Sequence, residues 1–428
     1  MAQAPSIPKG TRDFGCVEMA RRNYIFDTIK GVFGLFGYQQ IETPAMENLS
    51  TLLGKYGDEG DKLLYRILNS GDAFAGVDFA SAPSSAAITS KVCEKGLRYD
   101  LTVPFARFVT QHQNEISFPF KRFQIQPVWR ADRPQKGRFR QFVQCDIDIL
   151  GDPTNLAEIE LIVATTTLLG RLGFEGFTVR INDRRILKAM ADYAGFDESS
   201  YDQVFIILDK MDKIGIEGVL EELVKSGFAE DAVKKYCELF CAATQEGGLP
   251  KLQEMLGDHL QKECSDNLLT IMETAGALKA ADFQIVFDPT LVRGMSYYTG
   301  TIFEIGMDAC SFSVAGGGRY DEMIGRFTGQ KTCACGFSIG FERIITVLLD
   351  QDFKVPGTQE KYAFLIEKGA TAERICEVMR EARAYREKGC QVLVAQMNKN
   401  KKFQKEQLLK EGYQVENIRD FYNTEFKR

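Results

Sequence analysis

The spacing of apolar residues predicts a helix and a short strand at the start of the chain. Residues 18–36 carry apolar side chains close to a helical period, and Gly37 supplies the helix end. Residues 38–41 are then expected to form a strand. Residues 78–89, rich in Ala and Ser, are expected to form a mobile loop.

The centre of the chain carries a strand pattern on both sides of a basic turn. Phe118 to Val128 and Phe142 to Leu150 are typical of strands, and residues 130–140 join them as a long antiparallel hairpin. A helix is expected to begin near Asp152 and to end near Gly170. This order predicts an antiparallel sheet with helices packed against it.

A long helical block follows and interrupts the strand pattern. Residues 184–282 carry Leu, Met and Ile at helical spacing, with a break at Gly247 and Gly248. This block is interpreted as a helical module inserted into the sheet. Three strands and a helix are expected after it: Phe283 to Phe287, Thr301 to Ile305, Phe312 to Val314, and the helix Gly340 to Leu349.

The last part of the chain changes to an alternating pattern. Residues 350–360, with Pro356 and Gly357, read as a linker, and from Tyr362 the order is strand, helix, strand, helix. That order predicts a small α/β domain with a mostly parallel sheet. The fold class is therefore α+β, and 428 residues allow two to four domains at roughly 100–200 residues each.

The composition is that of an ordinary globular protein, with 44% hydrophobic and 26% charged residues. No apolar run approaches the ~20 residues that cross a bilayer, and the N-terminus lacks a secretory signal pattern. We expect a cytoplasmic protein without membrane association; additional use in mitochondria stays open. The net charge of −6 argues against a protein that coats nucleic acid, although residues 130–140 and 399–410 are locally basic.

The 11 cysteines are scattered through a large chain, which favours reduced residues over a disulfide framework. Two close pairs, Cys237 with Cys241 and Cys333 with Cys335, lack the further Cys or His ligands of a structural zinc site. The chain has only two histidines. We therefore expect no protein-bound zinc.

Five cations crowd the turn of the central hairpin. Arg130, Arg133, Lys136, Arg138 and Arg140 lie within 11 residues. A solvated hairpin tip is one interpretation. The other is a phosphate clamp, because the planar guanidinium group matches phosphate oxygens in a bidentate way.

A second segment combines Arg293 and Gly294 with Tyr297 and Tyr298. A β-turn with two core aromatic residues would explain it. The functional interpretation is that the arginine faces a reacting phosphate while the tyrosine hydroxyls contact a polar ligand.

Glycines mark two further segments. Residues 316–318 read as a glycine-rich loop, which either lets backbone approach a ligand or forms a tight turn. Gly336 and Gly340 precede an apolar helix that places Arg343 near its N-terminus. A cation is disfavoured there by the helix dipole unless it contacts an anion bound at the same terminus.

Asp100 and Thr102 alternate in phase, which predicts that they share one face of a strand. That face either belongs to a site or is exposed to solvent.

In this order the segments resemble the histidyl-tRNA synthetases, a family of class II aminoacyl-tRNA synthetases, over nearly the whole chain. Three segments are similar to motifs shared across class II, and two to histidine-specific signatures. The shared ones are Gly37 to Asn48, residues 128–148 and Gly336 to Ile344; the specific ones are Leu291 to Tyr298 and Ala315 to Asp321. Leu97 to Arg107 is similar to the eukaryote-type amino-acid binding loop.

The resemblance implies a domain organisation. Residues 1–175 and 283–350 would form the class II catalytic domain, and residues 176–282 the helical insertion domain near the tRNA acceptor arm. A linker of residues 351–360 would lead to an anticodon-binding α/β domain, residues 361–428, whose last elements are expected to be missing. The family also implies a homodimer.

The resemblance implies that L-histidine and ATP form histidyl-adenylate and pyrophosphate, and that histidine then passes to the 3′ end of tRNA(His). Arg130 and Arg293 would hold the α-phosphate, with Arg293 as the principal catalytic group. Asp132, Arg138, Phe142 and Arg343 would complete the ATP site, and Mg²⁺ would accompany the nucleotide. Asp132 stands where the family usually has Glu, and Met295-Ser296 where it usually has Leu-Asp.

The histidine pocket is implied by the same correspondence. Asp148 would accept from one ring nitrogen and Tyr298 would satisfy the other, although a solvent-facing Asp148 is the alternative. Asp100, Thr102 and Gln144 would surround the α-ammonium group, and Tyr297 and Tyr320 would line the pocket. Residues 399–410 would face the tRNA.

Other functions fit the sequence less well. A non-catalytic relative, with a regulatory or amino-acid-sensing role, would typically lose the clamp arginines, whereas Arg130, Arg293 and Arg343 are all present. A class II enzyme for another amino acid conflicts with the Arg-Gly and Tyr-Tyr signature. A P-loop NTPase or a serine hydrolase lacks its motif here.

Overall fold

The structure is a computed structural model, and it describes residues 5–55, 57–79, 84–135, 137–245, 248–292, 298–307, 312–350, 355 and 359–423. The backbone contacts divide the chain into two compact units, Met1–Asp13 with Asn23–Asp352, and Phe14–Arg22 with Phe353–Arg428. Each unit is described by itself. Among the described residues, no helix is both long and apolar enough to cross a bilayer.

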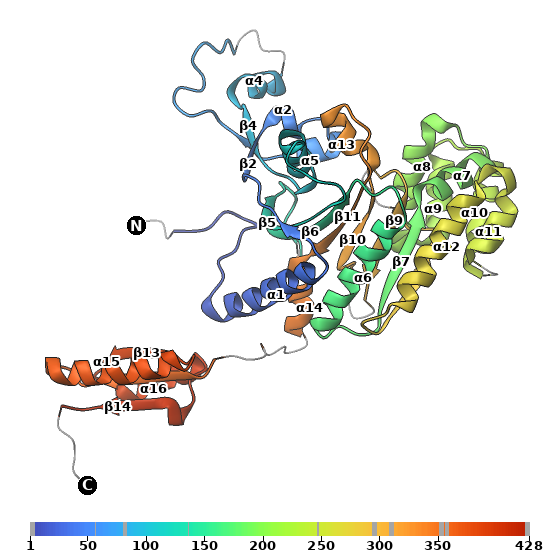
Figure 1. Cartoon of the computed structure of the whole chain (residues 1–428). Coiled ribbons are helices and arrows are strands. Elements are labelled where there is room, and N and C mark those ends of the chain that lie inside the picture. The colour runs from blue at the N-terminus through green and yellow to red at the C-terminus, as the bar shows by residue number, and fades with distance from the viewer. Residues whose placement is uncertain are drawn as a thin grey trace. The chain divides into compact units, whose positions relative to one another are not determined.

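An eight-stranded sheet organises the larger unit (Figure 1). Its strands are β1 (Gln39–Gln40), β5 (Phe120–Trp129), β6 (Gln141–Leu150), β7 (Phe177–Asp183), β8 (Phe283–Phe287), β9 (Thr301–Gly306), β10 (Ala315–Arg319) and β11 (Ala334–Gly340). They run in the order β1-β5-β6-β11-β10-β9-β7-β8, and the pairs are antiparallel except β1 with β5 and β7 with β8. The predicted antiparallel sheet and its long hairpin are confirmed.

Helices cover this sheet. They are α1 (Cys16–Leu35), α5 (Thr102–His112), α6 (Leu156–Arg171), α12 (Lys262–Ala277), α13 (Asp321–Thr328) and α14 (Phe341–Asp350). Helices α6 and α12 lie side by side, with α6 on β6 and β11 and α12 on β7 and β8 (Figure 1). Phe26 of α1 stacks on Phe341 of α14 with ring centroids 4.2 Å apart. This stacking positions α14 at the end of β11. Residues of the cavity described below lie there.

The predicted helical block lies between β7 and β8. Its helices are α7 (Arg184–Ala194), α8 (Tyr201–Leu208), α9 (Met211–Lys225), α10 (Glu230–Gln245) and α11 (Gly248–Leu256), with short 3₁₀ turns at Glu198–Ser200 and Gly257–His259. Asp183 caps α7 by accepting from the backbone N–H of Arg185 at 2.8 Å. Gly195 ends α7 in the left-handed conformation, with φ at 93°. The predicted break falls between α10 and α11, although Gly247 itself lies outside the described residues.

A smaller sheet in the same unit corrects one expectation. It orders β2 (Met46–Asn48), β4 (Lys95–Leu97) and β3 (Arg66–Ile67), with α2 (Leu49–Leu52), α3 (Gly57–Lys62) and α4 (Ser85–Val92) nearby in sequence. The loop expected at residues 78–89 is wrong from Ser85 onward, where α4 begins. Ser84 caps that helix by accepting from the N–H of Ala87 at 3.3 Å. Serine is a strong N-cap residue and alanine a strong helix former, so the same composition that suggested a loop builds a helix.

The C-terminal unit contains a three-stranded parallel sheet, as predicted. The order is β13-β12-β14, with β12 (Lys361–Ile366), β13 (Gln391–Gln396) and β14 (Ile418–Phe421). Helices α15 (Ala372–Glu387) and α16 (Lys401–Lys410) follow β12 and β13 along the chain. The apolar centre of the unit includes Phe364 of β12 and Val378 of α15, both buried.

A buried ion pair ties β10 to α6. Arg319 donates from Nε and Nη2 to the two carboxylate oxygens of Glu158, both at 2.7 Å, and from Nη1 to the backbone carbonyl of Asp152 at 3.1 Å. The Glu158 side chain is 1% exposed. The bidentate geometry compensates for the desolvation of both charges. Arg319, the cation of the second histidine-specific signature, thus serves to join two elements.

Replacing Arg319 with Met should lower the free energy of unfolding by about 3–5 kcal/mol, because it leaves Glu158 buried and without its counter-charge. The measurement is urea unfolding followed by the fluorescence of Trp129, the single tryptophan of the chain, which lies in β5. The matched control is Lys225→Met, which removes an exposed pair with Glu221 and should cost less than about 1 kcal/mol. Equal losses in the two variants would contradict this role of Arg319.

Candidate functional site

A cavity of about 680 Å³ brings distant segments of the larger unit together. It is lined by the basic hairpin turn, by β6, β10 and β11, by the start of α14 and by the residues before α5. Every predicted site residue in the described part of the chain lines it: Asp100, Thr102, Arg130, Asp132, Arg138, Phe142, Gln144, Asp148, Tyr298, Tyr320 and Arg343. Arg293 and Tyr297 lie outside the described residues.

The floor of the cavity is built by alternate residues of β6. Gln144, Asp146 and Asp148 share one face of this strand because side chains alternate with a period of two. Asp148 is 4% exposed, so the solvent-facing alternative for it is wrong. Its carboxylate lies 2.6 Å from Nη2 of Arg122, which is fully buried on β5, and it accepts the hydroxyl proton of Tyr320.

Burial changes the acidity of the two floor aspartates. Removal from water raises the pKa of Asp146 to about 7; the Asp148 and Asp100 charges add to this, while Arg122 and the hydroxyl of Ser338 oppose it. Burial also raises the pKa of Asp148, although Arg122 and the Tyr320 hydroxyl favour its charged form. A ligand that brings positive charge to this floor would therefore be stabilised by carboxylates that water does not screen.

Two glycines leave room for this floor. A Cβ atom at Gly336 on β11 would lie 2.0 Å from Oδ1 of Asp148, and one at Gly317 on β10 would lie 1.9 Å from the carbonyl oxygen of Gly336. Residues 316–318, expected to form a loop, are part of strand β10 instead. The expected strand Phe312 to Val314 is also wrong, because the strand begins at Ala315. The glycines predicted a loop, but in the structure they permit close packing of β10 and β11.

The opposite end of the cavity is cationic. Arg130 donates from Nε to the carbonyl of Tyr99 at 3.1 Å, and its guanidinium carbon lies 4.3 Å from the centre of that ring and 5.1 Å from that of Phe142. Within the described part of the chain, the terminal nitrogens of Arg130 have no hydrogen-bond partner. Arg138, half-exposed, pairs with the largely buried Asp132 at 2.9 Å. Arg130 is thus held beside two aromatic rings, and Arg138 is held by its ion pair with Asp132.

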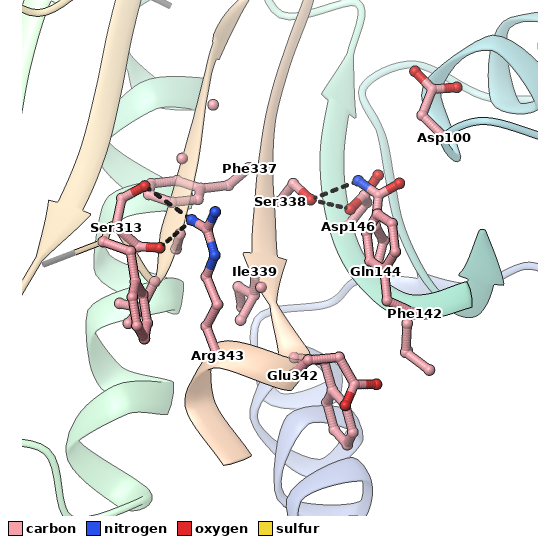
Figure 2. Close-up of a pocket in the computed structure, with 18 of the residues that line it drawn as sticks. Asp100, Phe142, Gln144, Asp146, Ser313, Phe337, Ser338, Ile339, Glu342 and Arg343 are labelled. Atoms are coloured by element: carbon pink, nitrogen blue, oxygen red, sulfur yellow. Dashed lines mark hydrogen bonds between the residues drawn. The ribbon is translucent and has the colours of Figure 1, made fainter. Parts of the chain in front are cut away.

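Arg343 lies on a different side of the cavity from the carboxylates. It is the third residue of α14, and it donates from Nη1 to the backbone carbonyl and the hydroxyl of Ser313. Figure 2 shows Arg343 and Ser313 on one side of β11, and Gln144, Asp146 and Asp100 on the other. Arg343 and these acids therefore lie on opposite sides of β11, whereas Arg130 lies beside Phe142, on the side of Gln144.

The expected strand through Asp100 and Thr102 is wrong. Strand β4 ends at Leu97, and Thr102 begins α5. Oδ1 of Asp100 accepts from the N–H of Val103 at 3.2 Å, which is a capping contact at the first turn of that helix. A residue that caps a helix can also stand two positions before the first residue of that helix. The spacing of Asp100 and Thr102 alone therefore did not distinguish a helix cap from a strand. Both residues still line the cavity.

Three residues of the site were not predicted from the sequence: Asp146, Ser338 and Arg122. Asp146 is 4% exposed. A signal was available in the hairpin, where Arg122, Gln124 and Gln126 of β5 stand opposite Asp148, Asp146 and Gln144 of β6. Polar residues at matching alternate positions of two apolar strands indicate a buried polar face.

This arrangement selects a ligand with charges of both signs. The arginines can bind phosphate or carboxylate groups, and the aspartates an ammonium group or ring N–H donors. Within the described ranges, no three His, Cys, Asp or Glu side chains gather closely enough to hold a metal ion.

The sequence was then compared with known proteins. The sequence model described as "Histidyl-tRNA synthetase" matches residues 91–344. A protein of Phocaeicola vulgatus named "Histidine--tRNA ligase" is 49% identical over 357 residues, which cover 82% of this chain and 78% of that protein. One of the same name from Porphyromonas gingivalis is 44% identical over 391 residues, covering 86% and 82%. These relatives are bacterial and give no support to the eukaryotic subtype expected from Leu97 to Arg107.

Solved structures agree with the sequence comparison. The histidyl-tRNA synthetase of Nostoc sp. PCC 7120 superimposes with a TM-score of 0.76 at 25% identity, covering 96% of this chain and 90% of that one. An "ATP phosphoribosyltransferase regulatory subunit/histidyl-tRNA synthetase" of Bacillus halodurans gives 0.77 at 21% identity, covering 99% and 100%. The second likeness concerns the fold alone.

Replacing Gly336 with Ala should displace the Asp148 carboxylate from the floor and lower the free energy of unfolding by about 1–3 kcal/mol, because the new methyl group has no space. Trp129 fluorescence in a urea titration measures the loss. Gly276→Ala is the control, since its Cβ would make an ordinary 3.7 Å contact on helix α12. That variant should be neutral or more stable by about 0.5–1 kcal/mol. An unchanged Gly336→Ala protein would refute the tight packing.

Proposed function

The chain belongs to the histidyl-tRNA synthetase family, and from this premise we propose which groups of the cavity carry out its reaction. The protein is a histidine–tRNA ligase: it activates L-histidine with ATP and transfers the histidine to the 3′ end of tRNA(His). The observation that carries the residue assignments is that arginine and aspartate side chains line one and the same cavity. A phosphate chain and an amino acid need opposite charges around them, and the cavity offers both.

Activation forms one bond and breaks another at the α-phosphate. A carboxylate oxygen of histidine attacks phosphorus, and the bond to pyrophosphate breaks as pyrophosphate leaves. The nucleophile is already ionised, so positioning and charge stabilisation account for catalysis. Arg130 binds the α-phosphate through its terminal nitrogens, which have no partner among the described residues. Arg293 binds it from the other side and is the principal catalytic group.

The remaining ATP contacts are assigned to one aromatic ring and two further arginines of the cavity. Phe142, next to Arg130, stacks on adenine, and Arg343 binds the γ-phosphate. Arg138 assists at the exposed edge, where Asp132 holds it by an ion pair at 2.9 Å. ATP enters as its Mg²⁺ complex, and the metal supplies charge neutralisation on the phosphates.

The acidic floor binds histidine. Asp148 accepts a hydrogen bond from one ring nitrogen, and Tyr298 satisfies the other. Asp100, Thr102 and Gln144 surround the α-ammonium group. Tyr297 and Tyr320 line the pocket, and Tyr320 also donates to Asp148. An amino acid without ring N–H groups would leave these buried polar atoms unpaired, which gives strong discrimination.

The transfer step requires tRNA to be held by other parts of the chain. We assign residues 1–175 and 283–350 to the catalytic domain and residues 176–282 to an insertion domain over the acceptor arm. After a linker of residues 351–360, residues 361–428 form the anticodon-binding domain. The protein is proposed to act as a cytoplasmic homodimer.

The basic segment 399–410 is only partly available to RNA. Lys401 and Lys405 both pair with Asp420, at 3.0 and 2.9 Å. Lys399, Lys402 and Lys410 are exposed. These three are the proposed phosphate contacts of this unit.

The proposed activity is tested by ATP–pyrophosphate exchange with each of the twenty amino acids. Exchange is expected with histidine alone. Exchange with another amino acid would retain the fold and overturn the pocket assignment. Histidine binding by calorimetry without any exchange would instead favour an amino-acid-sensing protein.

Arg130→Ala and Arg293→Ala should each lower kcat of the exchange reaction by about 10²–10³-fold, because each removes charge stabilisation at the α-phosphate. Arg383→Ala is the control, since that side chain is 79% exposed in the C-terminal unit. If Arg293→Ala retained full activity, the principal catalytic role would belong to another group.

Asp148→Asn should raise KM for histidine by about 10–100-fold, since it removes a charged acceptor from a ring N–H, while KM for ATP stays near its original value. Steady-state exchange kinetics measure both constants. The control is Asp258→Asn, at an exposed position beside α11. Equal changes in the two KM values would indicate a general collapse of the cavity.

A further inference from the structure

A chain of hydrogen bonds leads from Asp146 to Gln144 through Ser338. Nε2 of Gln144 donates to Oγ of Ser338 at 3.1 Å, and that hydroxyl donates to Oδ1 of Asp146 at 2.5 Å (Figure 2). We propose that Asp146 and Ser338 are positioning residues that orient the amide of Gln144 so that its oxygen faces the α-ammonium group of histidine. The proposal rests on the proposed function, which places that group beside Gln144.

The direction of these two hydrogen bonds follows from the number of protons that the three side chains can donate. An ionised carboxylate only accepts, so the single hydroxyl proton of Ser338 is committed to Asp146. Ser338 then has only lone pairs to offer Gln144, and the group that approaches it must be the NH₂ group. The amide oxygen of Gln144 is therefore left on the other side. An amide is otherwise free to turn by 180°, and this chain removes that freedom.

The surroundings support this orientation. Ser338 stands directly opposite Asp146 in the pairing of β11 with β6, so the contact is fixed by strand register. Oε1 of Gln144 is buried and has no hydrogen-bond partner within the described part of the chain. A buried acceptor without a partner is costly unless a ligand supplies a donor. The α-ammonium group has three N–H donors and a charge that the amide oxygen dipole attracts.

Protonation of Asp146 would reverse the direction of these two hydrogen bonds. A neutral carboxyl can donate to Ser338, whose proton can then go to Gln144, and the amide would turn its NH₂ group toward the ammonium. Burial raises the pKa of Asp146 to about 7, so this occurs as the pH falls through 7. The groups that face Asp146 are Arg122 on β5, Asp148 on β6, Ser338 on β11 and Asp100 before α5.

The test compares L-histidine with 3-(imidazol-4-yl)propanoate, which lacks only the α-ammonium group. Calorimetry gives both Kd values at pH 8 and at pH 6, and their ratio is the preference for the ammonium. Because the α-ammonium group lowers the imidazole pKa of histidine relative to the analogue, each Kd is first corrected for the imidazole titration of the free ligand, measured separately. In the wild-type protein the preference should fall at least threefold from pH 8 to pH 6.

Asp146→Asn should lower the preference at pH 8 by at least tenfold and abolish its dependence on pH, because Asn can donate to Ser338 at every pH. Ser338→Ala interrupts the chain without changing charge and should lower the preference at least threefold, which keeps the test valid if Asp146→Asn does not fold. Asp258→Asn should behave like the wild type. A pH-independent preference in the wild type, or equal weakening of both ligands in the variants, would overturn the proposal.

The outcomes also separate this proposal from the proposed function. If the wild type catalyses histidine-dependent exchange but binds both ligands equally, the ligase assignment stands and the positioning role is overturned. If it neither binds histidine nor supports exchange, the proposed function fails, and the positioning role fails with it.

Discussion

Arg122 is the buried cation on which the acidic floor of the cavity depends. It is fully buried on β5, and its guanidinium lies against the carboxylate of Asp148 and 4.0 Å from the ring centre of Phe105. Arg122 supplies one positive charge against the three carboxyl groups of Asp100, Asp146 and Asp148. The floor therefore keeps an excess of negative charge in a buried position. Burial raises the pKa of Asp146 and the negative excess adds to it, while the carboxylates of Asp146 and Asp148 accept the hydroxyl protons of Ser338 and Tyr320.

The acidic and the basic residues of the cavity come from different kinds of structural element. Asp146 and Asp148 stand on β6 in the middle of an eight-stranded sheet, where register fixes their neighbours on β5 and β11, and Asp100 precedes α5. The arginines come from a hairpin turn and from the first turn of α14. Under the proposed function, the strand surface would select the amino acid, and groups at the ends of elements would bind the nucleotide.

Much of the fold could be predicted from sequence because apolar periodicity is a local property. The hairpin of β5 and β6, the helical block and the parallel C-terminal sheet all follow from it. Asp100 and Thr102 could not be placed, since a cap residue and a strand residue give the same spacing. The glycines of β10 could not be assigned to a strand either. They are explained by the close approach of Gly336 on β11, a strand that comes from a later part of the sequence. The polar residues of β5 opposite Asp146 indicate that it lies on a buried polar face, but its hydrogen bond with Ser338, 192 residues away, could not be predicted from the sequence.

The run of glycines in β10 has a consequence for engineering the protein. Each glycine in a strand interior weakens the strand by roughly 0.5–1 kcal/mol through the entropy of the unfolded chain. A search for heat-resistant variants would ordinarily replace such residues first. Here the space above Gly317 is occupied by the backbone of Gly336, whose own missing side chain makes room for Asp148. Stabilising substitutions must therefore be sought away from these two strands, on exposed helices such as α9 and α15.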